Sequence, residues 1–151
     1  YTTTETYGNI NQYWQRFLAA NEDAGTGTDD HNLVTPATGF QGTAYFAAEN
    51  TTTERSLITN AVSVIPYQDL QLKILLAATG SGYDASQDYL IIEYSYNGTT
   101  FSPLGAFAGA SGAFRVDANS DGTGDGTTLT AAMAEFTYNI PKTGTNLQIR
   151  L

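Results

Sequence analysis

Oxygen-bearing side chains recur at alternate positions in residues 117–125, where the chain reads DANSDGTGD. Ca²⁺ takes about six to eight oxygen ligands, and a tight loop with such groups at its positions 1, 3 and 5 can wrap around it. A glycine at position 6 permits the sharp turn that brings the next backbone carbonyl inward. The sequence therefore predicts a calcium site formed by Asp117, Asn119, Asp121, the carbonyl of Thr123, and Asp125.

The match to the calcium loop of helix–loop–helix proteins covers only the first six positions. That loop carries a glutamate at position 12, where this chain has Thr128. Any further ligands would therefore come from elsewhere in the protein. Aspartate, asparagine and glycine also form solvated turns without a metal, and this alternative stays open.

Groups that could carry catalysis are few. The chain has no cysteine, and its one histidine, His31, lies in a polar loop beside two aspartates. It has no Gly-x-Ser-x-Gly motif to supply a nucleophile, and no His/Cys cluster to bind zinc. A glycosidase needs two carboxylates across a cleft, and the sequence alone does not place its glutamates there. We expect a protein that is not an enzyme.

The charge of the chain restricts its partners. Six Lys and Arg residues stand against 15 Asp and Glu residues, giving a net charge of −9. An acidic surface repels phosphate, so we expect no nucleic-acid partner, and the chain has no apolar run long enough for membrane insertion. Abundant Thr, Gly, Asn and Tyr with little Lys favour a secreted or cell-surface β protein. Tyr1 indicates that a signal peptide has been removed or that the chain is part of something longer.

Alternation of apolar and polar residues predicts strands over 69–77, 89–96 and 146–151. The pair Asn97-Gly98 predicts a two-residue hairpin turn, followed by a return strand over 99–104. Shorter strands are expected at 43–47, 61–65 and 135–140. Seven or more short strands separated by turn signals predict one all-β domain over residues 1–151, an antiparallel β-sandwich.

Residues 10–18 fit two kinds of structure. Apolar residues recur there at helical spacing, namely Ile10, Tyr13, Trp14, Phe17 and Leu18. The same segment read as a strand also has two distinct faces, and the β-rich remainder favours the strand. Periodicity does not decide between helix and strand. Residues 1–40 are accordingly expected to form an N-terminal extension or the first strands.

Four segments together resemble known jelly-roll modules. They are GTAYFAAE at 42–49, DYLIIEYSYNG at 88–98, DANSDGTGDGTTL at 117–129, and FTYNI at 136–140 with GTNL at 144–147. In this order they resemble the concanavalin-type jelly-roll modules of large secreted or surface proteins of marine bacteria, which are distantly similar to MAM and laminin-G domains. The resemblance covers residues 40–151 and implies an extracellular, non-catalytic, calcium-stabilised jelly roll.

By the same resemblance Glu49 and Asp88 fall where such modules place additional metal-facing carboxylates. Ordinary solvated strand-end acids are the alternative. Modules of this kind continue past the strand matching 146–151 into a closing strand, which this chain lacks. The resemblance thus implies a gap, to be filled by another part of the chain, a separate chain, or a neighbouring copy through strand addition.

The leading functional expectation is a structural or adhesive building block at the cell surface that self-assembles, with the Thr-rich residues 1–6 as a strand donor. The alternative is a carbohydrate-binding module, in which aromatic rings lie against a polysaccharide. Candidate rings are Tyr13, Trp14, Tyr67, Tyr83 and Tyr96. In the alternative, Trp14 and Tyr96 belong to the core and the others are scattered surface tyrosines. A third possibility is an accessory domain of a larger enzyme.

Overall fold

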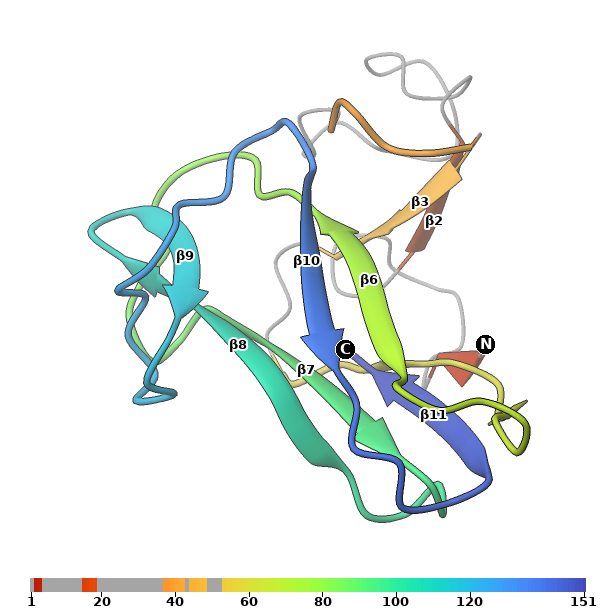
Figure 1. Ribbon diagram of the computed structural model, residues 1–151. Helices are drawn as coiled ribbons and strands as arrows, with labels where there is room; N and C mark the ends of the chain where they lie inside the picture. The colour runs from red at the N-terminus through yellow and green to blue at the C-terminus, as the bar shows by residue number, and fades with distance from the viewer. Residues whose placement is uncertain (1, 4–14, 19–36, 43, 49–52) are drawn as a thin grey trace.

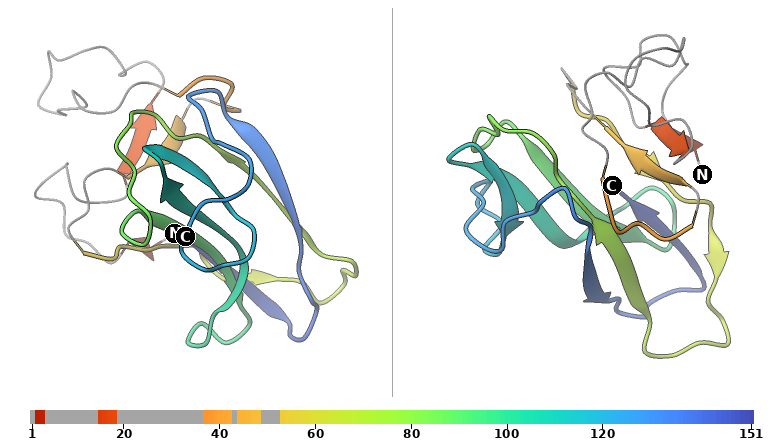
Figure 2. Two further views of the ribbon diagram at one scale, coloured as in Figure 1. Left: turned by 90° about the vertical axis from the view of Figure 1, so that its left-hand side faces the viewer. Right: turned by 90° about the horizontal axis from the view of Figure 1, so that it is seen from above.

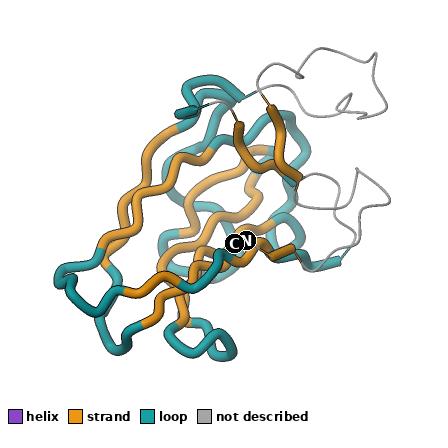
Figure 3. Tube along the Cα trace, turned by 90° about the vertical axis from the view of Figure 1, so that its right-hand side faces the viewer, coloured by secondary structure: helices purple, strands orange, loops and turns teal. Residues whose placement is uncertain are grey.

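The computed structural model describes residues 2–3, 15–18, 37–42, 44–48 and 53–151 (Figure 1). This part of the chain consists of strands and loops without a helix (Figure 3). The strands are β1 (Thr2–Thr3), β2 (Gln15–Leu18), β3 (Ala44–Ala47), β4 (Leu57–Ile58), β5 (Val62–Ser63), β6 (Gln71–Leu76), β7 (Tyr89–Ser95), β8 (Ser102–Ala110), β9 (Ala113–Asp117), β10 (Ala134–Asn139) and β11 (Asn146–Arg150). The prediction of an all-β protein is confirmed.

Strand pairing produces one large sheet and two small ones. The large sheet has the order β1-β4-β11-β7-β8-β9, with β5 also pairing with β11. β6 pairs with β10, and β2 pairs with β3, each as a separate two-stranded sheet. All of these strand pairs are antiparallel. β9 and the loop that follows it lie at one end of the molecule, away from β2 and β3 (Figures 1 and 2).

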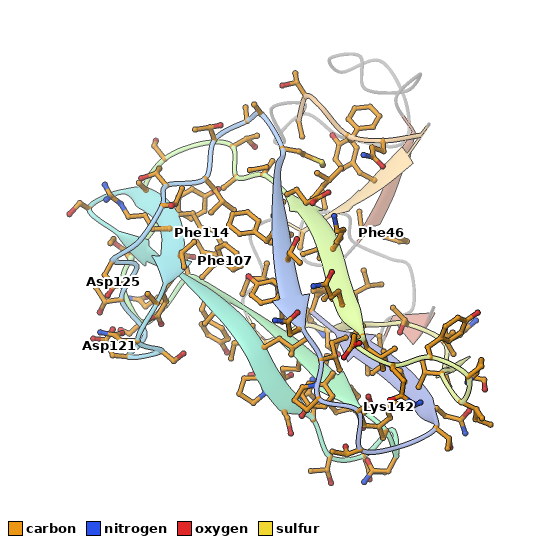
Figure 4. All side chains as sticks on the ribbon, viewed as in Figure 1. Phe46, Phe107, Phe114, Asp121, Asp125 and Lys142 are labelled. Carbon is orange, nitrogen blue, oxygen red and sulfur yellow. The ribbon has the colours of Figure 1, made fainter. Side chains whose placement is uncertain are left out.

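The β6–β10 sheet packs on one face of the large sheet and encloses the core between them. Ile92 of β7 and Phe107 of β8 are fully buried. The Phe107 ring meets Phe136 of β10 edge-on, with centroids 5.0 Å apart, and stacks on Phe114 of β9 at 6.4 Å (Figure 4). Leu129, which follows the predicted calcium loop, completes this cluster. The loop is therefore anchored directly in the core.

Three strands predicted by alternation are found close to their expected bounds, as β6, β7 and β11. Leu72, Ile74 and Leu76 of β6, Leu90 and Ile92 of β7, and Ile149 of β11 do face the core. The strand expected at 61–65 is shorter, because only Val62–Ser63 pairs with β11. Within 10–18 the strand interpretation is confirmed for Gln15–Leu18, and residues 10–14 lie outside the described residues.

The predicted two-residue turn at Asn97-Gly98 is wrong. β7 and β8 last pair at Tyr94 and Ser102, so the connection is longer. Gly98 has a positive φ of 73°, but Asn97 is not among the left-handed residues, and a two-residue turn of this kind needs both. Instead, the Asn97 side-chain oxygen accepts a hydrogen bond from the N–H of Thr100 at 2.8 Å. The asparagine thus closes a wider loop through its side chain.

A two-residue turn of the expected kind lies further along the chain. Ser111 and Gly112 have φ values of 52° and 78°, and they join β8 to β9 between the paired residues Ala110 and Ala113. Two consecutive left-handed residues match the right-handed twist of a hairpin. The return strand predicted over 99–104 begins later, at Ser102, and runs further, to Ala110.

The strand that corresponds to residues 146–151, β11, lies inside the large sheet. β11 has β7 on one side, and β4 and β5 on the other. Thr2 and Thr3, part of the proposed strand donor, pair with Ile58 and Leu57 of the same chain. The other residues of that donor lie outside the described residues. β4 and β5 thus fill the side of β11 opposite β7, and the missing closing strand stays a prediction.

Candidate metal site

The predicted calcium loop begins at the end of β9 and returns along the same strand. Asp117 is the last residue of β9 and is only 5% exposed. The carbonyl of Val116 accepts hydrogen bonds from the N–H groups of Asp125 and Gly126, at 3.0 and 2.8 Å. Further on, the Leu129 N–H donates to Phe114 O at 2.8 Å. Both ends of the loop are thus fixed to β9.

Asp117 organises the tip of the loop. One of its carboxylate oxygens accepts the N–H of Asp121 at 3.2 Å, and the other accepts the N–H of Gly122 at 2.9 Å. A carboxylate oxygen can accept more than one such contact, so both oxygens retain capacity for a cation. This buried carboxylate shapes the chain around itself in the way a metal-binding loop requires.

The other predicted side chains also bind the loop's own backbone. The Asn119 oxygen accepts the N–H of Asp121 at 3.1 Å, and one Asp121 oxygen accepts the N–H of Thr123 at 2.9 Å. Asp125 accepts the N–H of Ala118 at 2.8 Å and so ties the two ends of the loop together. Asn119, Asp121 and Asp125 are exposed, and Figure 4 shows Asp121 and Asp125 at this end of the molecule.

Gly122 makes the sharp turn that the sequence predicted. Its φ is 85°, in the region that favours glycine. Ser120 also has a positive φ, of 59°, which is uncommon for a residue with a Cβ atom. The Gly122 carbonyl accepts a hydrogen bond from Ser86 N at 2.8 Å, so a second turn, residues 84–88, lies against the loop.

Asp88 belongs to that second turn. Its carboxylate accepts the N–H of Asp84 at 2.7 Å, and its own N–H donates to Asp84 O at 3.1 Å. Asp88 therefore closes its own turn, and the contact between Ser86 and Gly122 brings that turn beside the calcium loop. Glu49, the other additional carboxylate, lies outside the described residues.

Gly124 seats the loop on the sheet, and sequence reasoning missed this role. It is buried, and a Cβ atom there would lie 2.4 Å from the carbonyl oxygen of Ala108 and 2.7 Å from Arg115 Cβ. The loop covers Ala108 so closely that this residue of β8 is 1% exposed. The sequence carries one signal of this role, the glycine-rich run GTGDG at 122–126. Taken alone, this run can be compared only with a phosphate-binding loop, and it lacks the lysine that such a loop needs.

The predicted site residues carry oxygen atoms of the kind that bind calcium. In the structure these side chains accept hydrogen bonds from the loop's own backbone. No group of three or more His, Cys, Asp or Glu side chains with metal-holding geometry occurs within the part of the chain described. Asp121 and Asp125 instead accept N–H groups of the loop's own backbone. Calcium therefore stays a prediction, made for a loop whose backbone is already folded around Asp117.

Two of the candidate sugar-binding tyrosines are part of the packing. The Tyr83 hydroxyl donates to Thr79 O at 2.6 Å, and its ring packs on Phe114 with centroids 5.1 Å apart. The Tyr96 hydroxyl donates to Pro141 O at 3.0 Å, and burial raises the pKa of this phenol. Tyr67 is 60% exposed. Tyr13 and Trp14 lie outside the described residues.

Searches for related proteins add no assignment. Comparison with family models, with curated proteins and with solved structures gave no match. Among the residues that the structure describes, no helix is long and apolar enough to cross a membrane.

Proposed function

We propose that this chain is an extracellular, non-catalytic β-sandwich of the jelly-roll type, stabilised by calcium, that acts as a structural or adhesive building block at the cell surface. The observation that carries the proposal is the buried Asp117, which accepts two backbone N–H groups at the centre of an acidic loop. This loop closes one end of the β8–β9 hairpin and leads into the core at Leu129. A cation bound there would stabilise the whole domain.

The expected stabilisation follows from mass action. An extracellular calcium module has a Kd of the order of 10⁻⁴ M, so 10 mM calcium is about 100 times Kd and stabilises by about 2.7 kcal/mol. For a chain of 151 residues this corresponds to a rise in Tm of roughly 5–10 °C. Three aspartates within nine residues also repel one another, and this repulsion disappears when the ion neutralises them.

The test is thermal unfolding in 10 mM CaCl₂ and in EDTA, together with calorimetric titration of Ca²⁺. Asp121→Asn keeps the shape of the side chain but removes one charge, and it should abolish most of the calcium-dependent rise in Tm. Glu135→Gln is the matched control, because Glu135 pairs with Lys73 on the β6–β10 sheet. Equal Tm values in calcium and EDTA for the unaltered chain would refute the metal site.

A carbohydrate-binding function is the second candidate, and the exposed Tyr67 favours it. The Lys142 ammonium donates to the carbonyls of Ile65 and Tyr67, and the Tyr67 N–H donates to Val64 O at 3.1 Å. These hydrogen bonds hold the loop that carries the Tyr67 ring, beside the exposed Ile65. A flat aromatic surface of this kind can lie against the apolar face of a sugar ring.

Binding to insoluble polysaccharides separates the two functions. Retention on chitin, cellulose or alginate that disappears in Tyr67→Ala but persists in Tyr83→Phe would establish the carbohydrate-binding function. If no polysaccharide retains the protein while calcium still raises its Tm, the structural function is favoured.

A further inference from the structure

The loop between β7 and β8 carries the dipeptide Asn97-Gly98, in which the asparagine side chain can react with the backbone. Attack of the Gly98 nitrogen on Asn97 Cγ closes a five-membered ring, because only Cβ, Cα and the carbonyl carbon of Asn97 separate the two atoms. Glycine favours this closure, since it has no side chain to obstruct it. The loop lies at the lower end of the molecule in Figure 1, and both residues are exposed. Water can therefore reach the product of such a reaction.

A buried hydroxyl links the two reacting groups. Ser95 is 2% exposed, and its hydroxyl oxygen accepts the Gly98 N–H at 2.9 Å. The same hydroxyl donates its own hydrogen to the Asn97 side-chain oxygen at 3.0 Å. A serine hydroxyl has one hydrogen and two lone pairs, and the second lone pair accepts the Asn97 N–H at 3.2 Å. Ser95 thus connects the nitrogen that would attack with the oxygen of the group that would be attacked.

Further donors converge on the Asn97 side-chain oxygen. The N–H groups of Thr99 and Thr100 donate to it at 2.9 and 2.8 Å, and the Thr99 hydroxyl donates at 3.1 Å. Donors aimed at a carbonyl oxygen stabilise the negative charge that develops there when a nucleophile adds to the carbon. The Asn97 Nδ2 group has no hydrogen-bond partner among the residues that the structure describes, so its departure would break no hydrogen bond.

We propose that residues 95–98 form an intramolecular reaction site that converts Asn97 into a succinimide, with Ser95 as the proton relay. As Gly98 N bonds to Asn97 Cγ, the Gly98 proton passes to Ser95 Oγ, and the Ser95 hydroxyl proton passes to Asn97 Oδ1. The Cγ–Nδ2 bond then breaks, the proton on Oδ1 passes to the leaving nitrogen, and ammonia departs. Ser95 ends the reaction unchanged.

Hydrolysis completes the change. Water adds to either carbonyl of the ring and gives aspartate or isoaspartate at position 97. An aspartate there would accept the same N–H groups of Thr99 and Thr100, and hydrogen bonds to a charged acceptor are stronger. The net charge of −9 becomes more negative by one. This chemistry goes beyond the proposed function and does not rest on it, because Ser95, Asn97 and Gly98 are not part of the predicted calcium loop.

Incubation of the folded chain at neutral pH tests the reaction. Mass spectrometry of the peptide that contains Asn97, together with an assay of released ammonia, gives the rate. The reference is the same chain unfolded in guanidinium chloride, where Ser95 is not held against Gly98. The folded chain should react at least as fast as the unfolded chain. Hydrogen bonds that only fix the loop would make the folded chain react more slowly, and that result would overturn the proposal.

Ser95→Ala removes the relay. General acid–base catalysis contributes roughly 10²–10⁴-fold, and water can replace part of it, so the folded variant should react about tenfold more slowly or less. Thr99→Val is the matched control, because it loses a hydroxyl that donates to the same Asn97 oxygen but does not accept the Gly98 N–H. In guanidinium chloride all three chains should react at similar rates. A folded Ser95→Ala chain that reacts no more slowly than folded Thr99→Val would overturn the relay.

A pH profile of the unaltered chain tests the relay without requiring Ser95→Ala to fold. In the unfolded chain hydroxide must remove the Gly98 proton, so the rate should rise with the hydroxide concentration. The relay starts from the neutral amide, and the rate of the folded chain should therefore change much less between pH 5.5 and 7.5. Parallel profiles for the folded and unfolded chains would overturn the inference. The effect of calcium on Tm, which tests the proposed function, is measured separately and does not depend on this result.

Discussion

Asp117 is expected to stabilise the fold even without metal, and Asp117→Asn in EDTA measures this contribution. Its two oxygens each accept a backbone N–H, and a hydrogen bond to a charged group contributes about 1.5–3 kcal/mol. Asparagine keeps one acceptor, now neutral, and turns its NH₂ group toward the other N–H. Because burying an amide costs less than burying a carboxylate, part of the loss is offset. We expect a net loss of about 2–3 kcal/mol, or roughly 4–12 °C in Tm.

Asp125→Asn is the matched control, since it makes the same chemical change at an exposed residue that accepts one N–H, from Ala118. Its remaining oxygen can keep that bond, so the change in EDTA should be below about 0.5 kcal/mol. In calcium both variants should lose stability, because both residues are predicted ligands. Thermal unfolding of the two variants in EDTA and in CaCl₂ gives all four values. An Asp117→Asn variant as stable as the unaltered chain in EDTA would refute the assigned role of the buried carboxylate.

Three further substitutions test the packing and the pH dependence. Gly124→Ala places a Cβ atom 2.4 Å from Ala108 O and should cost about 1–3 kcal/mol in chemical denaturation; an unchanged midpoint would contradict the seating of the loop. Phe107→Ala empties the centre of the core and should cost about 3–5 kcal/mol, and a loss below about 1 kcal/mol would show that Phe107 is not central. Burial raises the pKa of Tyr138 above its ordinary value of 10.0, so the stability that its neutral phenol contributes is complete below pH 10 and is lost as the pH rises through the folded-state pKa. Between pH 9.5 and 11.5, Tyr138→Phe should therefore lose less stability than the unaltered chain does. Tyr67→Phe, at an exposed position, is the control. Identical pH profiles of stability for Tyr138→Phe and the unaltered chain would refute this.

Strands with large apolar residues at alternate positions could be predicted from the sequence, whereas the β8–β9 hairpin could not. β6, β7 and β11 repeat Leu or Ile at every second position. Residues 105–113 are mostly alanine and glycine, which are uncommon in strands. The structure explains these small residues, because a Cβ atom at Gly105 would strike the Tyr138 ring and one at Gly109 would strike the backbone of Asp84. Other segments approach this hairpin so closely that only small residues fit there. The local sequence does not show these contacts.

The position of the candidate site could be predicted from the sequence, but its burial and its contacts with other segments could not. The order of oxygen-bearing residues located the loop, and the turn at Gly122 has the predicted conformation. The burial of Asp117 depends on residues that come from other parts of the chain. The contact of Ser86 with the loop likewise depends on tertiary structure. These features could not be predicted because they arise only when the β8–β9 hairpin and the 84–88 turn come together.

The central position of β11 has a consequence for the order in which the large sheet assembles. β11 is the only described strand that joins β7 to β4, and the pairing of Arg150 with Glu93 and Ile58 spans most of the chain. Contacts between residues so distant in sequence form late, because a long loop must close first. While residues 146–150 are still inside a ribosome, β7 and β4 have no strand between them to pair with. A polypeptide with this topology cannot join the two parts of its large sheet until residues 146–150 are free to pair.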